Sequence, residues 1–257
     1  MGRLLGLVAQ KPISVHLRAE PSASREGLPH CAGASGWGIG WYDGSRPAVF
    51  KYPSPEQRAK ESEPLTHTCH SRVLIAHIRE EKAAPGPENS HPFHYRNWMF
   101  AHSGKVNREV LVNLLEPAHR KSLTGGTDSE VLFHWILQNI KKTRDIVDSI
   151  RDALRSVASE SMQFVLSNGR WIFAFRTEHP LYAADWNPVN SSRPWVAWGS
   201  PVRLESGDLA QIRAVFVGSE TCGGMNWEPI PAGRLFAVSP RLDRYEIDLE
   251  KEADFVH

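Results

Sequence analysis

The order of secondary-structure patterns along the chain constrains its fold more than any other feature. Strand patterns fill the first part of the sequence, helix patterns fill the stretch from residue 106 to residue 159, and strand patterns then return. Strands on both sides of one helical block, in a chain without an internal repeat or a long linker, favour two sheets layered with helices. We therefore expect residues 1–257 to form a single α+β domain.

Short apolar or glycine-punctuated runs predict the strands. Residues 4–8 suggest a buried first strand, and the glycines within residues 36–42 indicate close backbone approach or a bulge. Asp43-Gly44 and Asn168-Gly169 each signal a two-residue hairpin. The remaining strands are expected at residues 48–52, 72–78 (a central strand), 98–102, 162–166, 171–176, 195–198, 211–217, 235–238 and 244–247.

Three helices are predicted between the two groups of strands. Residues 106–115 give the first, and the second begins at Thr127, whose spacing to Glu130 fits a capping box. Residues 145–159 place apolar side chains at helical spacing and give the third. Residues 53–64 hold at most one short helix, and residues 83–93 contain three prolines and a glycine, which predicts a loop.

Composition and charge exclude several classes of function. Thirty basic and twenty-nine acidic side chains leave a formal charge of +1, so no electrostatic footprint for nucleic acid or membrane is present. The apolar runs are too short to span a bilayer. The three cysteines, Cys31, Cys69 and Cys222, are odd in number and widely spaced, which suits reduced thiols in the cytoplasm. We expect a cytoplasmic protein without a cofactor.

A series of short motifs then appears in order over nearly the whole chain. The motifs are Arg3-Leu4-Leu5-Gly6, Gly36-Trp37-Gly38-Ile39-Gly40-Trp41-Tyr42, Ala76-His77-Ile78-Arg79, Glu88-Asn89-Ser90-His91-Pro92-Phe93, Trp98-Met99-Phe100-Ala101-His102-x-Gly104, Thr127-Asp128-Ser129-Glu130, and Ser219-Glu220 followed by residues 227–233. Each motif alone is weak, but the ordered set is specific. It resembles the class II (N-terminal nucleophile) glutamine amidotransferases, above all their small stand-alone branch, which includes the γ-glutamyl amidohydrolase of ergothioneine synthesis.

The resemblance implies a fold and a chemistry. The fold is a four-layer αββα sandwich of the N-terminal nucleophile hydrolase type, with two mostly antiparallel sheets between helical layers. In such enzymes the Cys after the initiator Met attacks the glutamine δ-amide, and its own freed α-amine serves as the base. Ammonia leaves from a thioester intermediate, and an oxyanion hole stabilises the tetrahedral state.

Matching residues imply where a substrate would bind. Arg79 corresponds to the family arginine that grips the glutamine α-carboxylate, and Asp128 to the acid that receives the α-ammonium. Outside the family context, Arg79 reads as a surface ion-pair residue, and Asp128 as a first-turn acid that favours the helix dipole. His91 and His102 are expected in or near the cleft, more as structural than as chemical groups.

Three departures from the family pattern fall at the reactive centre. Gly2 stands where the family has the nucleophilic Cys. Ser103-Gly104 replaces the Asn-Gly of the oxyanion hole, so a shorter hydroxyl donor takes the place of a side-chain amide even if the Gly104 N–H is kept. Lys82 puts bulky charge where a small hydroxyl residue is common.

Three readings of the chain follow from these departures. The first is a natural non-catalytic homologue that binds glutamine or a γ-glutamyl ligand, with any transfer reaction requiring a separate synthase or acceptor subunit. The second is an active glutamine or γ-glutamyl amide hydrolase whose nucleophile was mutated to Gly2. The third is a metal-binding protein, because histidines and a cysteine crowd one stretch without matching a metal signature. These residues are His67, Cys69, His70, His77, His91, His94 and His102.

Overall fold

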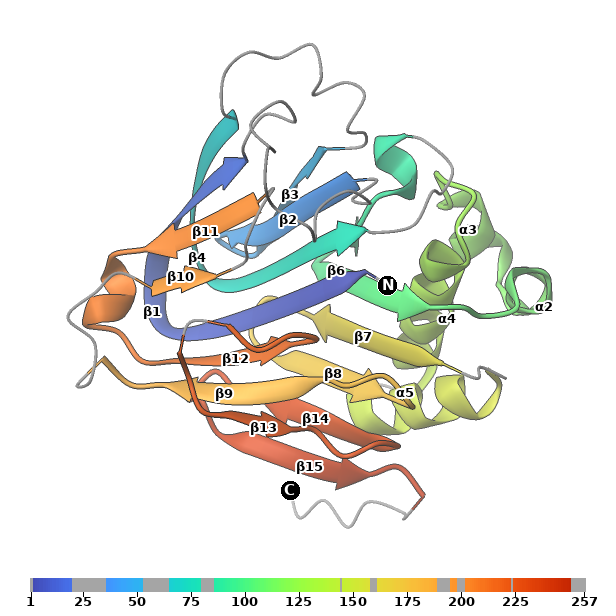
Figure 1. Cartoon of the computed structure of the whole chain (residues 1–257). Coiled ribbons are helices and arrows are strands. Elements are labelled where there is room, and N and C mark those ends of the chain that lie inside the picture. The colour runs from blue at the N-terminus through green and yellow to red at the C-terminus, as the bar shows by residue number, and fades with distance from the viewer. Residues whose placement is uncertain are drawn as a thin grey trace.

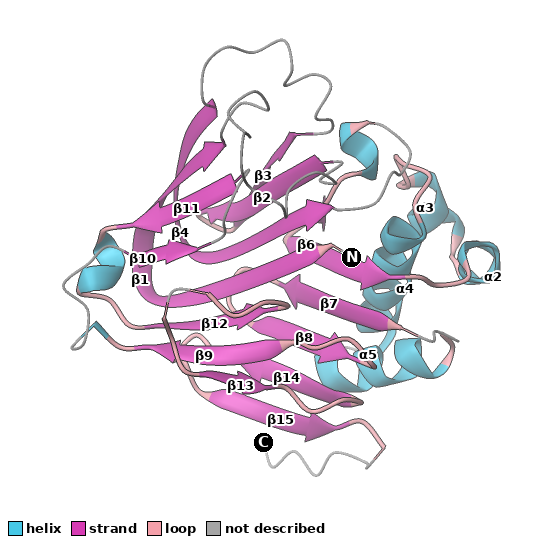
Figure 2. Ribbon diagram, in the orientation of Figure 1, coloured by secondary structure: helices cyan, strands magenta, loops and turns pink. Residues whose placement is uncertain are grey.

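The chain folds into two antiparallel β-sheets that pack face to face, with helices against one of them (Figure 1). The computed structural model describes residues 2–19, 36–52, 65–79, 86–143, 145–157, 161–188, 195–197, 202–222 and 224–250. Figure 2 shows the labelled α-helices gathered at one side of the stacked strands, with a 3-10 helix (Asp208–Ala210) at the other side. This arrangement confirms the expected α+β class with two antiparallel sheets.

The larger sheet, here called sheet A, has nine strands and contains both ends of the motif series. Its order is β13 (Trp227–Pro229), β9 (Tyr182–Trp186), β12 (Ala214–Gly218), β1 (Arg3–Ala19), β4 (Leu65–Arg79), β2 (Gly36–Asp43) and β3 (Arg46–Tyr52), with β11 (Val202–Ser206) pairing β1 and β10 (Trp195–Ala197) pairing β11. The two long strands β1 and β4 pair over most of their length, with an irregularity between Val8 and Ile13. They lie next to each other at the centre of the sheet and are its two longest strands.

The smaller sheet, sheet B, has six strands and packs across β1 and β4 through β6. Its order is β15 (Arg244–Asp248), β14 (Arg234–Val238), β8 (Ile172–Arg176), β7 (Met162–Ser167), β6 (Trp98–Gly104) and β5 (Phe93–Tyr95). Side chains that alternate inward from both sheets meet in one buried cluster, which includes Leu4, Ile75, Met99 and Val165. The core between the sheets therefore rests on the two-residue period of strands.

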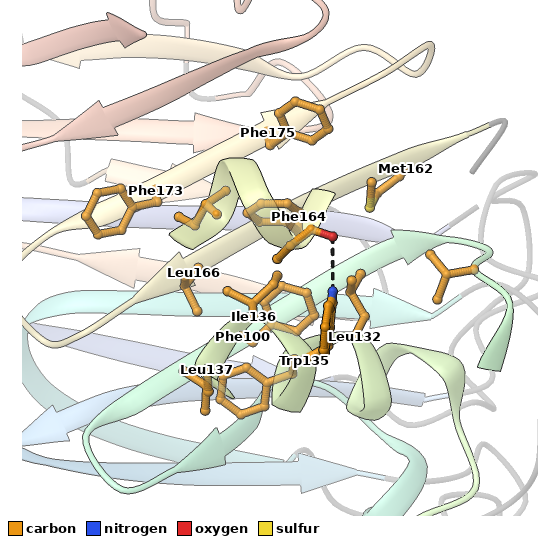
Figure 3. Close-up of a cluster of buried hydrophobic side chains, with 14 of the residues drawn as sticks. Phe100, Leu132, Trp135, Ile136, Leu137, Met162, Phe164, Leu166, Phe173 and Phe175 are labelled. Carbon is orange, nitrogen blue, oxygen red and sulfur yellow. Dashed lines mark hydrogen bonds between the residues drawn. The ribbon is translucent and has the colours of Figure 1, made fainter. Parts of the chain in front are cut away.

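Four helices cover the outer face of sheet B: α2 (Arg108–Leu114), α3 (Pro117–Lys121), α4 (Asp128–Thr143) and α5 (Ile146–Arg155). The apolar face of α4 packs against Phe100 and Phe164 of the sheet (Figure 3). Trp135 of α4 donates its indole N–H to the Ala153 carbonyl of α5 at 3.0 Å, which joins the two helices. None of the described helices combines the length and apolar character that crossing a bilayer requires.

The outer face of sheet A has its own apolar cluster. Side chains from β1, β2 and β4, among them Leu5 and Ile39, lie there with Leu209 of the short 3-10 helix η4 (Asp208–Ala210). Among the described residues this face thus carries a 3-10 helix, while the α-helices lie on sheet B. The expected region of one short helix, residues 53–64, lies outside the described part of the chain.

Most predicted elements are confirmed, and the exceptions have local causes. The first strand is far longer than residues 4–8, because the prediction took only the continuous apolar run and overlooked the apolar–polar alternation of residues 13–18. The hairpin at Asn168-Gly169 exists, but its loop spans residues 168–171, since Ser167 pairs with Ile172 and the Asn168 side chain accepts the N–H of Trp171 at 2.9 Å. The short helix α3 and strands β5, β9, β11 and β13 were missed.

The predicted capping box at the start of α4 is half formed. Thr127 accepts the N–H of Glu130 through its hydroxyl at 3.2 Å, as a box requires. The Glu130 carboxylate turns away from Thr127 and accepts the N–H groups of Thr124 and Gly125, both at 2.8 Å. Glu130 therefore stabilises the loop that precedes α4, and its carboxylate does not cap the first turn of the helix.

Candidate functional site

The candidate site lies where β1 begins and β4 ends. Leu4 pairs with His77 and Arg3 pairs with Ile78, so Gly2 stands beside Arg79 in the next position of the register. Side chains two residues apart on a strand share a face. His77 and Arg79 therefore project from the same face of sheet A, the face that is turned toward sheet B.

Gly2 and His77 are in close contact. A Cβ atom built on Gly2 would lie 2.5 Å from His77 Nε2, 2.9 Å from His77 Cε1 and 3.1 Å from the Ile78 carbonyl oxygen. The first two distances are shorter than ordinary van der Waals contacts, so any side chain at position 2 requires His77 to shift. The imidazole of His77 occupies the space in which a residue-2 side chain would start.

Glycines in β2 explain how His91 reaches this place. A Cβ on Gly38 would lie 2.1 Å from the His91 carbonyl oxygen, and one on Gly40 would lie 2.7 Å from Met99 Sδ and 3.1 Å from Pro92. The absence of side chains lets the segment that contains His91 cross the inner face of β2. The His91 ring then packs on His77, with ring centroids 4.3 Å apart.

His77 and His91 are neutral imidazoles with unused hydrogen-bonding atoms. Burial, with the Arg79 charge adding to it, lowers the pKa of His77 to about 3, and burial likewise holds the pKa of His91 well below its ordinary value. His77 Nε2 and both ring nitrogens of His91 have no hydrogen-bond partner among the described residues. A neutral imidazole has one donor and one acceptor nitrogen, so a polar ligand can satisfy these atoms.

Arg79 is held by Asn89, which sequence reasoning did not single out. The guanidinium donates through Nη1 to the Asn89 carbonyl oxygen at 2.8 Å. The Asn89 side chain accepts the Gly126 N–H, also at 2.8 Å, and is buried. Asn89 thus ties the end of β4 to the loop that leads into Asp128. Its place inside the matched motif at residues 88–93 was the available signal.

Asp128 is engaged with the backbone at the start of α4. Its carboxylate accepts the N–H of Val106 at 2.9 Å through one oxygen and that of Ser129 at 2.9 Å through the other. The residue is partly exposed. Each carboxylate oxygen has a further lone pair, so this anchoring is compatible with receiving a ligand ammonium. Its substrate-binding role stays a prediction.

Ser103 and Gly104 end β6 on the opposite side of the site. Ser103 is buried, and its strand parity with Met99 and Ala101 directs it toward sheet A. Gly104 has φ +139, and a Cβ there would lie 2.3 Å from the Ser161 carbonyl oxygen, so the backbone requires glycine whatever its role toward an oxyanion.

Gln163 is a second residue that the sequence did not reveal. It pairs directly with Ser103 across β6 and β7, so the two side chains share one face. Gln163 is 2% exposed, and its Oε1 has no hydrogen-bond partner among the described residues. A buried carboxamide therefore lies beside the position where the family's Asn amide is missing. Only the inward parity of β7 could have indicated it.

His102 lies on the helix side of β6. Its Nδ1 is 2.9 Å from the Ser129 hydroxyl, and its ring stacks with Phe100. Burial lowers the pKa of His102 to about 4, against the raising effect of the Asp128 charge. His102 thus has a clear structural contact to α4, and its predicted place near the substrate stays untested. Lys82 lies outside the described residues.

Metal binding finds no support in the arrangement of the seven residues that crowd residues 67–102. No group of three or more His, Cys, Asp or Glu side chains within the described ranges is placed to hold a metal ion. Cys69 is a buried free thiol, and burial raises its pKa to about 12, which makes its thiolate scarce. Cys31 lies outside the described residues.

Comparisons with known proteins agree with this geometry. A family model for class II glutamine amidotransferases matches residues 1–240. YafJ of Escherichia coli K12, which bears the name of a glutamine amidotransferase, is 30% identical over 192 residues, which cover 68% of this chain and 72% of YafJ. The γ-glutamyl-hercynylcysteine sulfoxide hydrolase of Mycobacterium tuberculosis H37Rv is 30% identical over 97 residues, 37% of this chain and 42% of that protein. The crystal structure of a predicted glutamine amidotransferase from Pseudomonas aeruginosa has a TM-score of 0.66 at 19% identity and covers 93% of this chain and 97% of its own.

Proposed function

This chain belongs to the class II glutamine amidotransferase family, and from that premise we propose that it is a natural non-catalytic member. In this proposal the protein binds glutamine or a γ-glutamyl compound and does not cleave it. A transfer reaction would depend on a separate synthase or acceptor subunit. The odd number of cysteines, three, supports a cytoplasmic location.

The contact between Gly2 and His77 carries the proposal. Nucleophilic catalysis by this family requires a side chain at position 2, and His77 Nε2 lies 2.5 Å from where its first atom would be. No hydroxyl or thiol can act from a glycine. The replacement of the family's Asn by Ser103 affects the same reaction, so two elements of the catalytic machinery differ together.

Retained recognition residues support the binding part of the proposal. Arg79 shares the inner face of sheet A with His77, and Asn89 links it to the loop before Asp128. A guanidinium can fork onto an α-carboxylate through two parallel hydrogen bonds. The ring nitrogens of His77 and His91 that have no hydrogen-bond partner, and the carboxamide of Gln163, are suited to the polar side-chain δ-amide of such a ligand.

The alternative is an active glutamine or γ-glutamyl amide hydrolase whose Cys was changed to Gly2. The same family membership supports this alternative. The two proposals differ in whether a thiol restored at position 2 releases ammonia from glutamine. Ammonia release from glutamine should be measured for Gly2→Cys and for Gly2→Cys combined with His77→Ala, which removes the steric conflict. Robust turnover in either protein favours the hydrolase. A thiol that is present and reactive, yet inert toward glutamine, favours natural loss of activity.

Binding itself is tested by calorimetric titration with glutamine. Arg79→Ala should weaken binding at least tenfold, because truncating one partner of a desolvated charge pair costs about 2–5 kcal/mol. Arg170→Ala, an exposed arginine in the hairpin at residues 168–171, is the matched control and should bind as the unmodified protein does. Absence of binding in every protein would leave a scaffold role and overturn the ligand proposal.

A further inference from the structure

The inner face of sheet B carries a polar atom that the described part of the fold does not satisfy. Gln163 of β7 is buried, and its Oε1 has no hydrogen-bond partner among the described residues. A buried acceptor without a donor costs about 1–3 kcal/mol, so such atoms in folded proteins call for an explanation. Gln163 stands directly opposite Ser103, one of the residues that depart from the family pattern. This position indicates a ligand that donates a hydrogen bond.

The packing of the two sheets places Gln163 at the candidate site. Val165, two residues along β7, lies against β1, where its Cγ1 is 3.0 Å from a Cβ atom built on Gly6. Farther along β7 the Ser167 carbonyl accepts the Tyr42 hydroxyl at 2.9 Å, and Tyr42 lies toward the end of β2 that is remote from the candidate site. The start of β7 therefore lies toward the candidate site, as the start of β1 does (Figure 1).

Gln163 and His77 face the same space from opposite sheets. Leu4 lies two residues before Gly6 on β1 and pairs with His77. The same step on β7 leads from Val165 back to Gln163, and strands rise about 3.3 Å per residue. Gln163 therefore comes opposite the row that Leu4 and His77 form. A ligand group that meets His77 Nε2 also meets the Gln163 carboxamide.

The polar groups at this end of the site are neutral. Burial lowers the pKa of both His77 and His91, which leaves their imidazoles uncharged at neutral pH. Arg176 pairs with Gln163 from β8, but its Nε and Nη1 donate to four backbone carbonyl oxygens. A ligand carboxylate here would lose its hydration and meet an acceptor oxygen. An amide would instead give that oxygen a donor.

From these contacts we infer that Gln163 is a specificity-determining residue, whose Oε1 accepts an N–H of the ligand's side-chain amide and thereby selects an amide over a carboxylate or an ester. The inference rests on the proposed binding of glutamine or a γ-glutamyl compound, and it narrows that class to primary and secondary amides. Glutamate and γ-glutamyl esters have no N–H at this position, so they leave Gln163 Oε1 unpaired. A non-catalytic protein with this selectivity distinguishes glutamine from glutamate without converting one into the other.

Calorimetric titration of the full chain with matched ligands at neutral pH tests this inference. The ligands are glutamine, glutamate, γ-glutamyl methylamide and the γ-methyl ester of glutamate. The methylamide and the ester are both neutral and nearly equal in size, and they differ in an N–H against an oxygen. The Kd of the ester should be at least about tenfold above that of the methylamide, and the Kd of glutamate at least about a hundredfold above that of glutamine. In Gln163→Met the methylamide and the ester should bind equally.

Gln138→Met is the matched control, because it removes another buried glutamine, on α4, whose carboxamide is used within the fold. Gln138 accepts the Glu116 N–H at 2.6 Å and donates to the Leu114 carbonyl oxygen at 3.1 Å. Gln138→Met should lower the free energy of unfolding and leave the ratio of the ester and methylamide Kd values unchanged. Gln163→Met should abolish that ratio without a loss of stability, which urea unfolding of each variant checks.

Two results would overturn the inference while glutamine still binds. They are equal Kd values for the methylamide and the ester in the unmodified protein, and a ratio that Gln163→Met leaves unaltered. Failure of every ligand to bind the unmodified protein is a different result, because it refutes the proposed glutamine binding and the selectivity together.

Discussion

A single methyl group at position 2 should destabilise the protein, because His77 already fills that space. In Gly2→Ala the new Cβ would lie 2.5 Å from His77 Nε2 and 3.1 Å from the Ile78 carbonyl oxygen. His77 has little room to move, since it is 3% exposed and packs on His91, whose carbonyl lies against Gly38. Overpacking of this kind costs about 1–3 kcal/mol.

Thermal and urea unfolding measure this cost directly. For a chain of this size, each kcal/mol lowers Tm by about 2–4 °C. Gly207→Ala is the matched control, because a Cβ there meets nothing within 4 Å and its φ is −71. It should be neutral or slightly stabilising. In a His77→Ala background, Gly2→Ala should cost less than about 0.5 kcal/mol, which makes the two sites strongly coupled. Equal stability of Gly2→Ala and Gly207→Ala would refute the packing argument.

Three further outcomes follow from the buried polar groups. Burial lowers the pKa of His77 and His91 in the folded protein, so the unfolded chain binds more protons in acid. Their contribution to the free energy of unfolding is complete above about pH 6.5 and is lost as the pH falls, by about 1.4 kcal/mol per pH unit for each histidine. Urea titrations from pH 7 to 4 should show that the free energy of unfolding falls less steeply with pH in His77→Asn. Gln163→Met should leave stability unchanged or raised while weakening glutamine binding at least tenfold by calorimetry, and loss of both would mean a purely structural role. Glu130→Gln should speed hydrogen exchange of the Gly125 amide, because the Glu130 carboxylate accepts that N–H. Asn139→Ala on the same helix is the control and should leave this exchange rate unchanged. An unchanged rate in Glu130→Gln would contradict the role of Glu130 in the loop.

Much of the fold could be predicted because its signals are local. The glycine-punctuated β2 and the β-branched second half of β4 have patterns that few other structures share. The capping residue Thr127 marked the start of α4, and apolar periodicity marked α5. The second half of β1 was missed although residues 13–18 alternate apolar and polar side chains, because only the continuous apolar run was taken as the strand.

The site was only partly readable for a different reason. Arg79 and Asp128 were found through motifs that resemble a known family, and their roles rest on that resemblance. The approach of His77 to Gly2 depends on strand register, and the pairing of Gln163 with Ser103 depends on which hairpins meet. These contacts join residues far apart in sequence. No local pattern could reveal these contacts, although the glycines of β2 did indicate a close backbone approach.

Titration of the unmodified protein with glutamine, with ammonia measured in the same sample, tests the central claim most directly. Glutamine should give saturable heat that disappears in Arg79→Ala, and no ammonia should appear above the level of a buffer blank. Stoichiometric or catalytic release of ammonia from glutamine would contradict it, since a chain with Gly2 in place of the nucleophile and His77 against it would then be an active amidase.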